Sequence, residues 1–178
     1  MATSNNGVFL NQRKYILDML QDAKMLHTKP TITPLDIKLR LDSSSKPFPT
    51  FTTYQKIVGK FIYLTITRPD ITFVVSLLSQ YMHAPTSQHL DLMKRILRYL
   101  KGTISRGIVM TRNRHTNIIG YTDSDWTGNA LDRRSTTGYC MFVGGNLVSW
   151  KNKKQQVVTR SSVEAEYRAT ASASCELI

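Results

Sequence analysis

Acidic residues are scarce in this sequence. Among its 178 residues, 12 Asp and Glu stand against 24 Lys and Arg, so the formal net charge is +12 at pH 7. This excess of positive charge favours contact with a polyanion, and the spread of the basic residues along the chain favours nucleic acid over a membrane surface. The alternative interpretation is a basic surface that binds nothing.

Cysteine and long hydrophobic runs are also scarce. The two cysteines, Cys140 and Cys175, match neither a disulfide framework nor a metal-binding spacing, which fits an intracellular location, cytoplasmic or nuclear. The apolar stretch over residues 61–78 is interrupted by an Arg-Pro-Asp triplet, so no membrane span and no membrane partner is expected. Residues 1–6 are polar and carry no secretory signal.

Several familiar catalytic motifs are absent. The sequence contains no Gly-x-x-x-x-Gly-Lys loop, dinucleotide fingerprint, Gly-x-Ser-x-Gly elbow or His-Glu-x-x-His pair. The four histidines are scattered, and His83 and His89 are expected at the surface of a helix pair. A hydrophobic content of 41% is ordinary for a folded protein, and the length permits one domain or two small ones.

The first part of the chain predicts helices. Residues 27–50 contain four prolines and a serine run, and are expected to form a linker. The clearest amphipathic pattern follows Pro85, with Leu90, Met93, Leu97 and Leu100 facing inward. Its outward Lys and Arg suit either solvent or a nucleic-acid track. Helices are predicted over residues 12–26, 54–67, 70–81 and 86–101, after a short strand over 7–10.

After residue 107 the hydrophobic period changes to two. This period predicts strands over residues 108–111, 118–123, 138–143 and 147–150. Gly144, Gly145 and Asn146 are expected to form a hairpin turn, since glycine adopts positive φ without steric cost. A last helix is expected from residue 161 to the end of the chain. The predicted class is α+β.

Two acidic stretches lie some forty residues apart, at residues 121–128 and 161–169. No acid occurs in the interval between Arg133 and Arg160. The basic residues of that interval are Arg133, Arg134, Lys151, Lys153, Lys154 and Arg160. Carboxylates flanked by Lys and Arg residues are typical of a site where a divalent metal ion contacts the phosphate backbone of a nucleic acid. The six basic residues are therefore the predicted nucleic-acid-binding residues.

In the first acidic stretch, Asp123 lies within the predicted strand and is the better metal candidate. Asp125, two residues on, shares its face if the strand continues that far. The alternative role for either aspartate is to cap the end of the strand.

In the second stretch, Ser161 and Glu164 have the spacing of a capping box, which assigns Glu164 a structural role. At about 100° per residue, Val163 and Tyr167 lie on an apolar arc that also contains Glu166. A buried acid is costly unless it is paired or metal-bound, so Glu166 is the predicted second metal ligand.

Four motifs occur in order: Tyr-Thr-Asp-Ser-Asp-Trp at 121–126, Arg-Arg-Ser-Thr-Thr-Gly-Tyr at 133–139, Ser-Trp-Lys at 149–151 and Ser-Ser-Val-Glu-Ala-Glu-Tyr at 161–167. Together they resemble the ribonuclease H domain of copia-type retrotransposon Pol polyproteins. Upstream, residues 54–59, 63–71 and 98–103 are similar to the connection segment that precedes this domain, and residues 7–26 are similar to the end of the reverse transcriptase.

The resemblance implies three segments. Residues 1–52 would be the tail of the reverse transcriptase and a linker, and residues 53–112 a helical connection segment. Residues 113–178 would be the amino-terminal half of a ribonuclease H-like domain, a partial sheet with one helix on it. The implied activity is cleavage of the RNA strand of RNA–DNA hybrids with two Mg²⁺ or Mn²⁺ ions. The implied partners are the hybrid and the remainder of the polyprotein.

The resemblance also implies site residues. The first catalytic aspartate of the family corresponds to Asp123 and its helix glutamate to Glu166. The family's later catalytic aspartates lie beyond this helix, and no Tyr-x-Asp-Asp polymerase motif occurs in the sequence, so the chain alone is expected to be inactive. The alternatives are a ribonuclease completed by another chain and a non-catalytic basic nucleic-acid-binding module.

Overall fold

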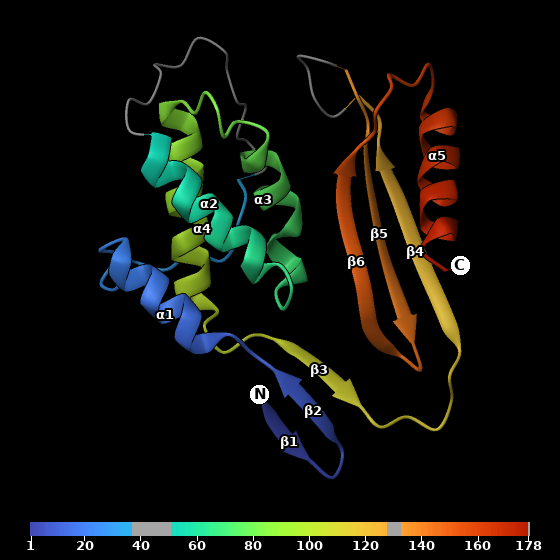
Figure 1. Ribbon diagram of the computed structural model, residues 1–178, viewed down its shortest axis with the longest axis horizontal. Coiled ribbons are helices and arrows are strands. Elements are labelled where there is room, and N and C mark those ends of the chain that lie inside the picture. Colours follow the sequence, from blue (N-terminus) through green and yellow to red (C-terminus); the bar gives the residue numbers. More distant parts are fainter. Residues whose placement is uncertain (37–50, 128–132, 178) are drawn as a thin grey trace. The chain divides into compact units, whose positions relative to one another are not determined.

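The computed structural model describes residues 1–36, 51–127 and 133–177 (Figure 1). Within these ranges the chain forms five α-helices, one 3-10 turn and two three-stranded sheets, so the predicted α+β class is confirmed. The chain divides into two compact units. Unit 1 contains Met1 and Phe9–Ile108, and unit 2 contains Ala2–Val8 and Val109–Ile178.

Unit 1 is built on helices. Its elements are α1 (Arg13–Asp22), α2 (Phe51–Leu64), the 3-10 turn η1 (Pro69–Ile71), α3 (Thr72–Ser79) and α4 (Ser87–Gly102). Apolar side chains from all four α-helices form one core, so α1 shares its core with the helices that follow the proline-rich segment. In α4, Met93, Leu97 and Leu100 are buried and Leu90 lies at the margin of the core, as the amphipathic pattern predicted.

Three helices of unit 1 differ from prediction at their ends. Helix α2 begins and ends three residues before the predicted range of 54–67. Helix α1 ends at Asp22 and not near residue 26, because Lys24 adopts a left-handed φ of 55° and turns the chain. The expected helix over residues 70–81 begins as the 3-10 turn η1 and becomes α3 only at Thr72.

The prediction that His89 lies at the surface is wrong. His89 is 3% exposed in the first turn of α4, where its Nδ1 accepts a hydrogen bond from the backbone N–H of Thr86 at 3.0 Å. Its ring lies 4.0 Å from the ring of Tyr81, centroid to centroid. Burial lowers the pKa of His89, and the neutral imidazole takes the place that glutamate usually has in a capping box. His83, by contrast, is exposed.

The strands form two sheets. In one sheet the order is β1 (Ala2–Ser4), β2 (Gly7–Leu10), β3 (Ile108–Thr111), and β1 was not predicted. The other sheet is antiparallel with the order β4 (Ile118–Asp125), β5 (Thr136–Val143), β6 (Asn146–Lys154). The last strand continues four residues beyond the predicted end, because Lys151–Lys154 remain paired with β5.

The turn between β5 and β6 has two residues rather than three. Gly144 and Gly145 both have positive φ, 57° and 78°, which suits the tight turn of a hairpin. Asn146 begins β6 instead, and its side-chain amide pairs with the backbone of Thr111: Oδ1 accepts the N–H at 2.7 Å and Nδ2 donates to the carbonyl at 2.9 Å.

Helix α5 (Ser162–Cys175) lies against β4 and β5, and its buried face differs from the prediction (Figure 1). The buried residues are Ala165, Ala169 and Ala173, while Val163 and Tyr167 are 60% and 73% exposed. Alanines four residues apart form a flat stripe that lets a helix approach a sheet closely, whereas larger side chains would hold it away. None of the helices in the described ranges is both long and apolar enough to cross a membrane.

Candidate metal and nucleic-acid site

The two faces of β4 have different surroundings. Thr122 and Ser124 are half-buried and pair with Tyr139 and Thr137, whose side chains lie under α5. The alternate residues of β4 point to the other face. Tyr121, for example, makes an edge contact with Phe142 at 6.0 Å between ring centroids, away from the helix.

Asp123 and Asp125 both lie on this second face and are exposed. Because β4 runs through Asp125, the two aspartates share one face, as predicted for a continuous strand. Neither carboxylate makes a hydrogen bond or an ion pair with another described residue. Both therefore keep their oxygens available for a ligand.

Glu166 lies at the edge of β4 and not within a buried arc. It is exposed, and its Oε1 accepts a hydrogen bond from the backbone N–H of Ser124 at 3.3 Å. In the described sheet β4 is an outer strand, and backbone N–H groups lie in the plane of a sheet. The structure thus brings Glu166 beside the residue that follows Asp123, and it does so from a helix some forty residues further along the chain.

The role of Asp123 and Glu166 as ligands of one divalent ion stays a prediction, since Asp123 lies on the face of β4 away from α5 and Glu166 at the edge of the strand. Ions of the magnesium type are bound by one or two carboxylates, with water and substrate phosphate as the other ligands. Asp123 has free oxygens, and Glu166 keeps Oε2 outside the bond to Ser124. In the described part of the chain, no group of three or more His, Cys, Asp and Glu residues has the arrangement of a metal site. The pair by itself therefore does not form a closed two-ion site.

Glu164 has the structural role that its spacing predicted. Its backbone N–H donates to Oγ of Ser161 at 3.1 Å, while its own Oε2 accepts the backbone N–H of Arg160 at 2.9 Å and Oε1 pairs with Arg168. The backbone bond from Arg160, then the bond from Arg168, lower the pKa of Glu164. In the standard capping box the glutamate side chain accepts from the backbone N–H of the N-cap residue. Glu164 accepts instead from the residue before the cap, Arg160.

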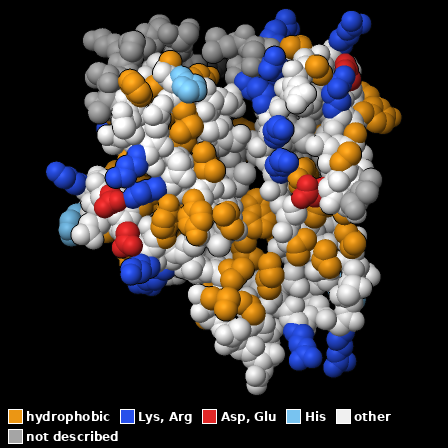
Figure 2. Space-filling model, in the orientation of Figure 1, with side chains coloured by type: hydrophobic (Ala, Val, Ile, Leu, Met, Phe, Trp, Pro, Cys, Tyr) orange, Lys and Arg blue, Asp and Glu red, His pale blue; other side chains and the backbone are white. Residues whose placement is uncertain are grey.

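The basic residues of the acid-free interval lie at the same end of the antiparallel sheet as the acids. Asp125 pairs with Thr136 and Thr136 with Lys154, so this acid and this lysine occupy the same row of the sheet, about 10 Å apart across three strands. Lys153 lies in the next row, opposite Thr137. Arg133 and Arg134 directly precede β5, and Arg160 directly precedes the cap of α5. Figure 2 shows Lys and Arg side chains gathered at the upper end of unit 2, where β4 ends in Figure 1. Lys151 lies two residues before Lys153 in β6, further from this end of the sheet.

The basic residues of α4 are structural for the most part. Arg98 donates from Nε to the carbonyl of Lys29 at 2.7 Å, and Lys101 donates to the carbonyl of Thr28 at 2.6 Å. Arg95 donates to Thr33 and Asp36 at 2.9 and 3.4 Å. These bonds hold the segment after α1 against α4. The sequence left open a solvent-exposed face and a nucleic-acid track, and the contacts of these three residues show a third role, which is to fasten this segment.

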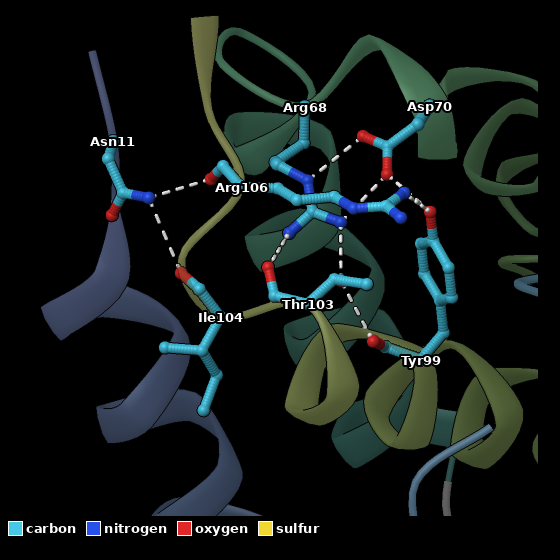
Figure 3. A network of polar contacts seen from close by, with 7 residues as sticks. All are labelled: Asn11, Arg68, Asp70, Tyr99, Thr103, Ile104 and Arg106. Atoms are coloured by element: carbon cyan, nitrogen blue, oxygen red, sulfur yellow. Dashed lines mark hydrogen bonds and ion pairs between the residues drawn. The ribbon is translucent and has the colours of Figure 1, made fainter. Parts of the chain in front are cut away.

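A buried arginine that the sequence did not identify organises the end of α4 (Figure 3). Arg68 is 1% exposed, bonds both carboxylate oxygens of Asp70 at 2.9 and 2.7 Å, and donates to the carbonyl and hydroxyl oxygens of Thr103 at 3.0 and 2.7 Å. Tyr99 donates to Asp70 at 2.7 Å and accepts from Arg106 at 3.0 Å. The sequence signal is the charged Arg-Pro-Asp triplet inside an apolar run, which by itself predicts only the absence of a membrane span.

Comparison with known proteins finds relatives that match nearly the whole chain. It is 47% identical over 177 residues to the uncharacterized mitochondrial protein AtMg00810 of Arabidopsis thaliana, covering 99% of this chain and 74% of that protein. It is 46% identical over 173 residues to the retrovirus-related Pol polyprotein from transposon RE2 of the same species, covering 96% of this chain. The chain belongs to the copia-type retrotransposon Pol family. The Pol polyprotein from transposon TNT 1-94 of Nicotiana tabacum is 36% identical over 185 residues, which cover 98% of this chain.

The resemblance is thereby confirmed at the level of the polyprotein. The chain spans 12% of the RE2 polyprotein and 14% of the TNT 1-94 polyprotein. No family model and no solved structure matches the chain. The expected divisions at residues 52 and 112 stay predictions.

Proposed function

We propose that residues 113–178 are the amino-terminal half of a ribonuclease H-like domain, which cleaves the RNA strand of RNA–DNA hybrids in a copia-type Pol polyprotein. The observation that carries the proposal is the bond from the backbone of Ser124 to Glu166. It joins the strand of Asp123 to the helix of Glu166, the two acids that the family motifs identify. Membership of the Pol family supports the same assignment.

In this proposal Asp123 and Glu166 hold Mg²⁺ or Mn²⁺, and the bound ion supplies charge stabilisation at the scissile phosphate. The chain's own residues position the glutamate and bind the hybrid. Ser124 holds one oxygen of Glu166 in place, and the basic residues at the same end of the sheet bind the phosphate backbone of the hybrid through charge. Such contacts position the hybrid without selecting its base sequence.

We further propose that the chain alone does not cleave hybrids. Two carboxylates give a two-ion site too few protein ligands, since each ion needs several oxygens. Cleavage then depends on acids supplied by the remainder of the polyprotein. The connection segment and reverse transcriptase tail assigned to residues 1–112 are part of the same proposal.

The test is cleavage of a labelled RNA–DNA hybrid with Mg²⁺ and with Mn²⁺, by the 178-residue chain and by a Pol polyprotein segment that contains it. We expect no cleavage by the chain and cleavage by the longer segment, lost with Asp123→Asn and with Glu166→Gln. Asp125→Asn is the matched control, because Asp125 shares the face of Asp123, and it should retain cleavage. Cleavage by the longer segment that survives both Asp123→Asn and Glu166→Gln would refute the ribonuclease assignment.

A non-catalytic nucleic-acid-binding module is the second candidate. Its support is the net charge of +12 and the position of exposed Lys153 and Arg160 at one end of the sheet. Binding of hybrid that is equally strong with EDTA and with Mg²⁺, together with no cleavage in the polyprotein segment, would favour this candidate over the first.

A further inference from the structure

Gln155 lies at a position where β4, β5 and α5 meet. It follows β6, and its backbone N–H donates to the carbonyl of Ser135 at 2.8 Å. Its side-chain Nε2 lies within hydrogen-bond distance of Oγ1 of Thr137 at 3.0 Å, the carbonyl of Ala165 at 3.0 Å and Oγ of Ser124 at 3.4 Å. One amide group therefore contacts β5, α5 and β4.

Two of the residues that Gln155 contacts are sequence neighbours of the two predicted metal ligands. Ser124 follows Asp123, and Ala165 precedes Glu166. The backbone of Ser124 also donates to Glu166. A side chain that holds Ser124 and Ala165 together thus sets how far the strand of Asp123 lies from the helix of Glu166.

The other end of the Gln155 side chain supports a specific role. Its Oε1 is buried and has no hydrogen-bond partner in the described part of the chain. A buried amide oxygen without a partner costs free energy. An apolar side chain of the same size would fill the space without this cost. We therefore attribute the presence of glutamine to its Nε2 donor, which an apolar residue lacks.

We propose that Gln155 is a positioning residue of the metal site: its amide donor sets the spacing between the strand of Asp123 and the helix of Glu166. This inference rests on the proposed function, because the site it serves is the one assigned there. It adds a residue that neither the acidic stretches nor the basic interval pointed to.

The experiment compares three variants of the full chain. Gln155→Met keeps the length of the side chain and removes both polar ends, and Gln155→Glu keeps the shape and removes the donor. Gln156→Met is the matched control, since Gln156 is the exposed neighbour. Three quantities are measured: the hydrogen-exchange protection of the Ser124 amide by NMR, Mn²⁺ affinity by electron paramagnetic resonance, and global stability by urea unfolding.

In both Gln155 variants we expect the protection of the Ser124 amide to fall about tenfold or more and Mn²⁺ affinity to fall several-fold. Amides of the β5–β6 pairing should keep their protection, and Gln156→Met should change neither quantity. Unchanged Ser124 protection in Gln155→Met overturns the proposal. A uniform loss of protection that follows global stability also overturns it, because that is the behaviour of a residue that only fastens the helix.

The failure of the proposed function gives a different result. If the wild-type chain binds no Mn²⁺ but Ser124 protection still falls selectively in the Gln155 variants, the metal site is refuted and the positioning of Glu166 by Gln155 is supported. If wild type binds Mn²⁺ and the Gln155 variants bind it equally well, the metal site is supported and the role of Gln155 is refuted.

Discussion

Tyr139 donates a hydrogen bond from its phenol oxygen to Oε2 of Glu176 at 2.6 Å, and Ser149 donates to Oε1 of the same carboxylate at 2.7 Å. The glutamate follows the last turn of α5, and the two hydroxyl groups belong to β5 and β6. One carboxylate therefore fastens the end of the helix across two strands. The hydrogen bond from Tyr139, followed by that from Ser149, lowers the pKa of Glu176.

This arrangement predicts how stability depends on acid pH. A carboxyl group whose pKa is lower in the folded state stabilises the fold above its unfolded pKa, about 4.3, and that contribution is lost as pH falls through the folded pKa. Tyr139→Phe should therefore reduce the free energy of unfolding at pH 6 and weaken its fall between pH 5 and pH 3. Urea unfolding at several pH values measures this. An acid dependence identical to that of wild type would contradict the role of Glu176.

The hydrogen bond between Tyr139 and Glu176 also predicts how stability changes at alkaline pH. Burial, and then the bond to Glu176, raise the pKa of Tyr139 to about 12. A group with a raised pKa stabilises the fold below its unfolded pKa, about 10, and loses that contribution as pH rises toward 12. Wild type should lose stability over this interval more than Tyr139→Phe does. Ultraviolet titration of tyrosinate gives an independent check, and the variant should lack one component with a pKa of about 12.

The start of α5 provides a ranking of three substitutions. Ser161→Ala removes the cap and should cost about 0.5–2 kcal/mol in unfolding free energy. Glu164→Ala should also destabilise, because it removes acceptors for Arg160 and Arg168. Glu166→Ala should change stability least, since Glu166 is exposed and accepts one long bond at 3.3 Å. Urea denaturation of the three variants tests this order, and a larger loss for Glu166 than for Glu164 would reverse the assignment of their roles.

The buried Arg68 of unit 1 predicts a large loss of stability when its carboxylate partner is removed. Asp70→Ala leaves Arg68 charged and buried without its carboxylate, which should destabilise the protein by about 3 kcal/mol or more. Burial opposes ionisation of Asp70, but the hydrogen bonds from Arg68 and Tyr99 prevail and hold its pKa below the ordinary value. Lys60→Gln, which breaks the exposed pair with Asp22, is the control and should cost under about 1 kcal/mol. Similar losses in the two variants would contradict the buried network.

Binding to RNA–DNA hybrid should weaken steeply with salt. Each phosphate contact contributes about 0.9 to the slope of log affinity against log salt on duplex DNA, so a Lys153→Gln, Arg160→Gln double variant should reduce the slope by about 2. The loss of affinity should be similar for hybrids of different base sequence. Fluorescence anisotropy at several salt concentrations measures both quantities. Lys94→Gln, in α4, is the matched control and should leave the slope unchanged.

Local patterns predicted much of the fold. The amphipathic period placed Met93, Leu97 and Leu100 in the core of α4, and two adjacent glycines located the hairpin turn, because these features depend on neighbours along the chain. The spacing of Ser161 and Glu164 likewise identified the helix cap. The family motifs singled out Asp123 and Glu166 through the residues that flank them, which are local features of the sequence as well.

The sequence by itself therefore determined the α+β class, most elements, the basic character and the Pol family. Tertiary structure decided which face of α5 is buried, since the close approach of helix and sheet selects Ala165, Ala169 and Ala173 over the more hydrophobic Val163 and Tyr167. It also decided that Arg68 and Gln155 lie where separate elements meet. No periodicity encodes such positions, because a buried polar side chain is stabilised by partners that are distant in sequence and become neighbours only when the chain folds.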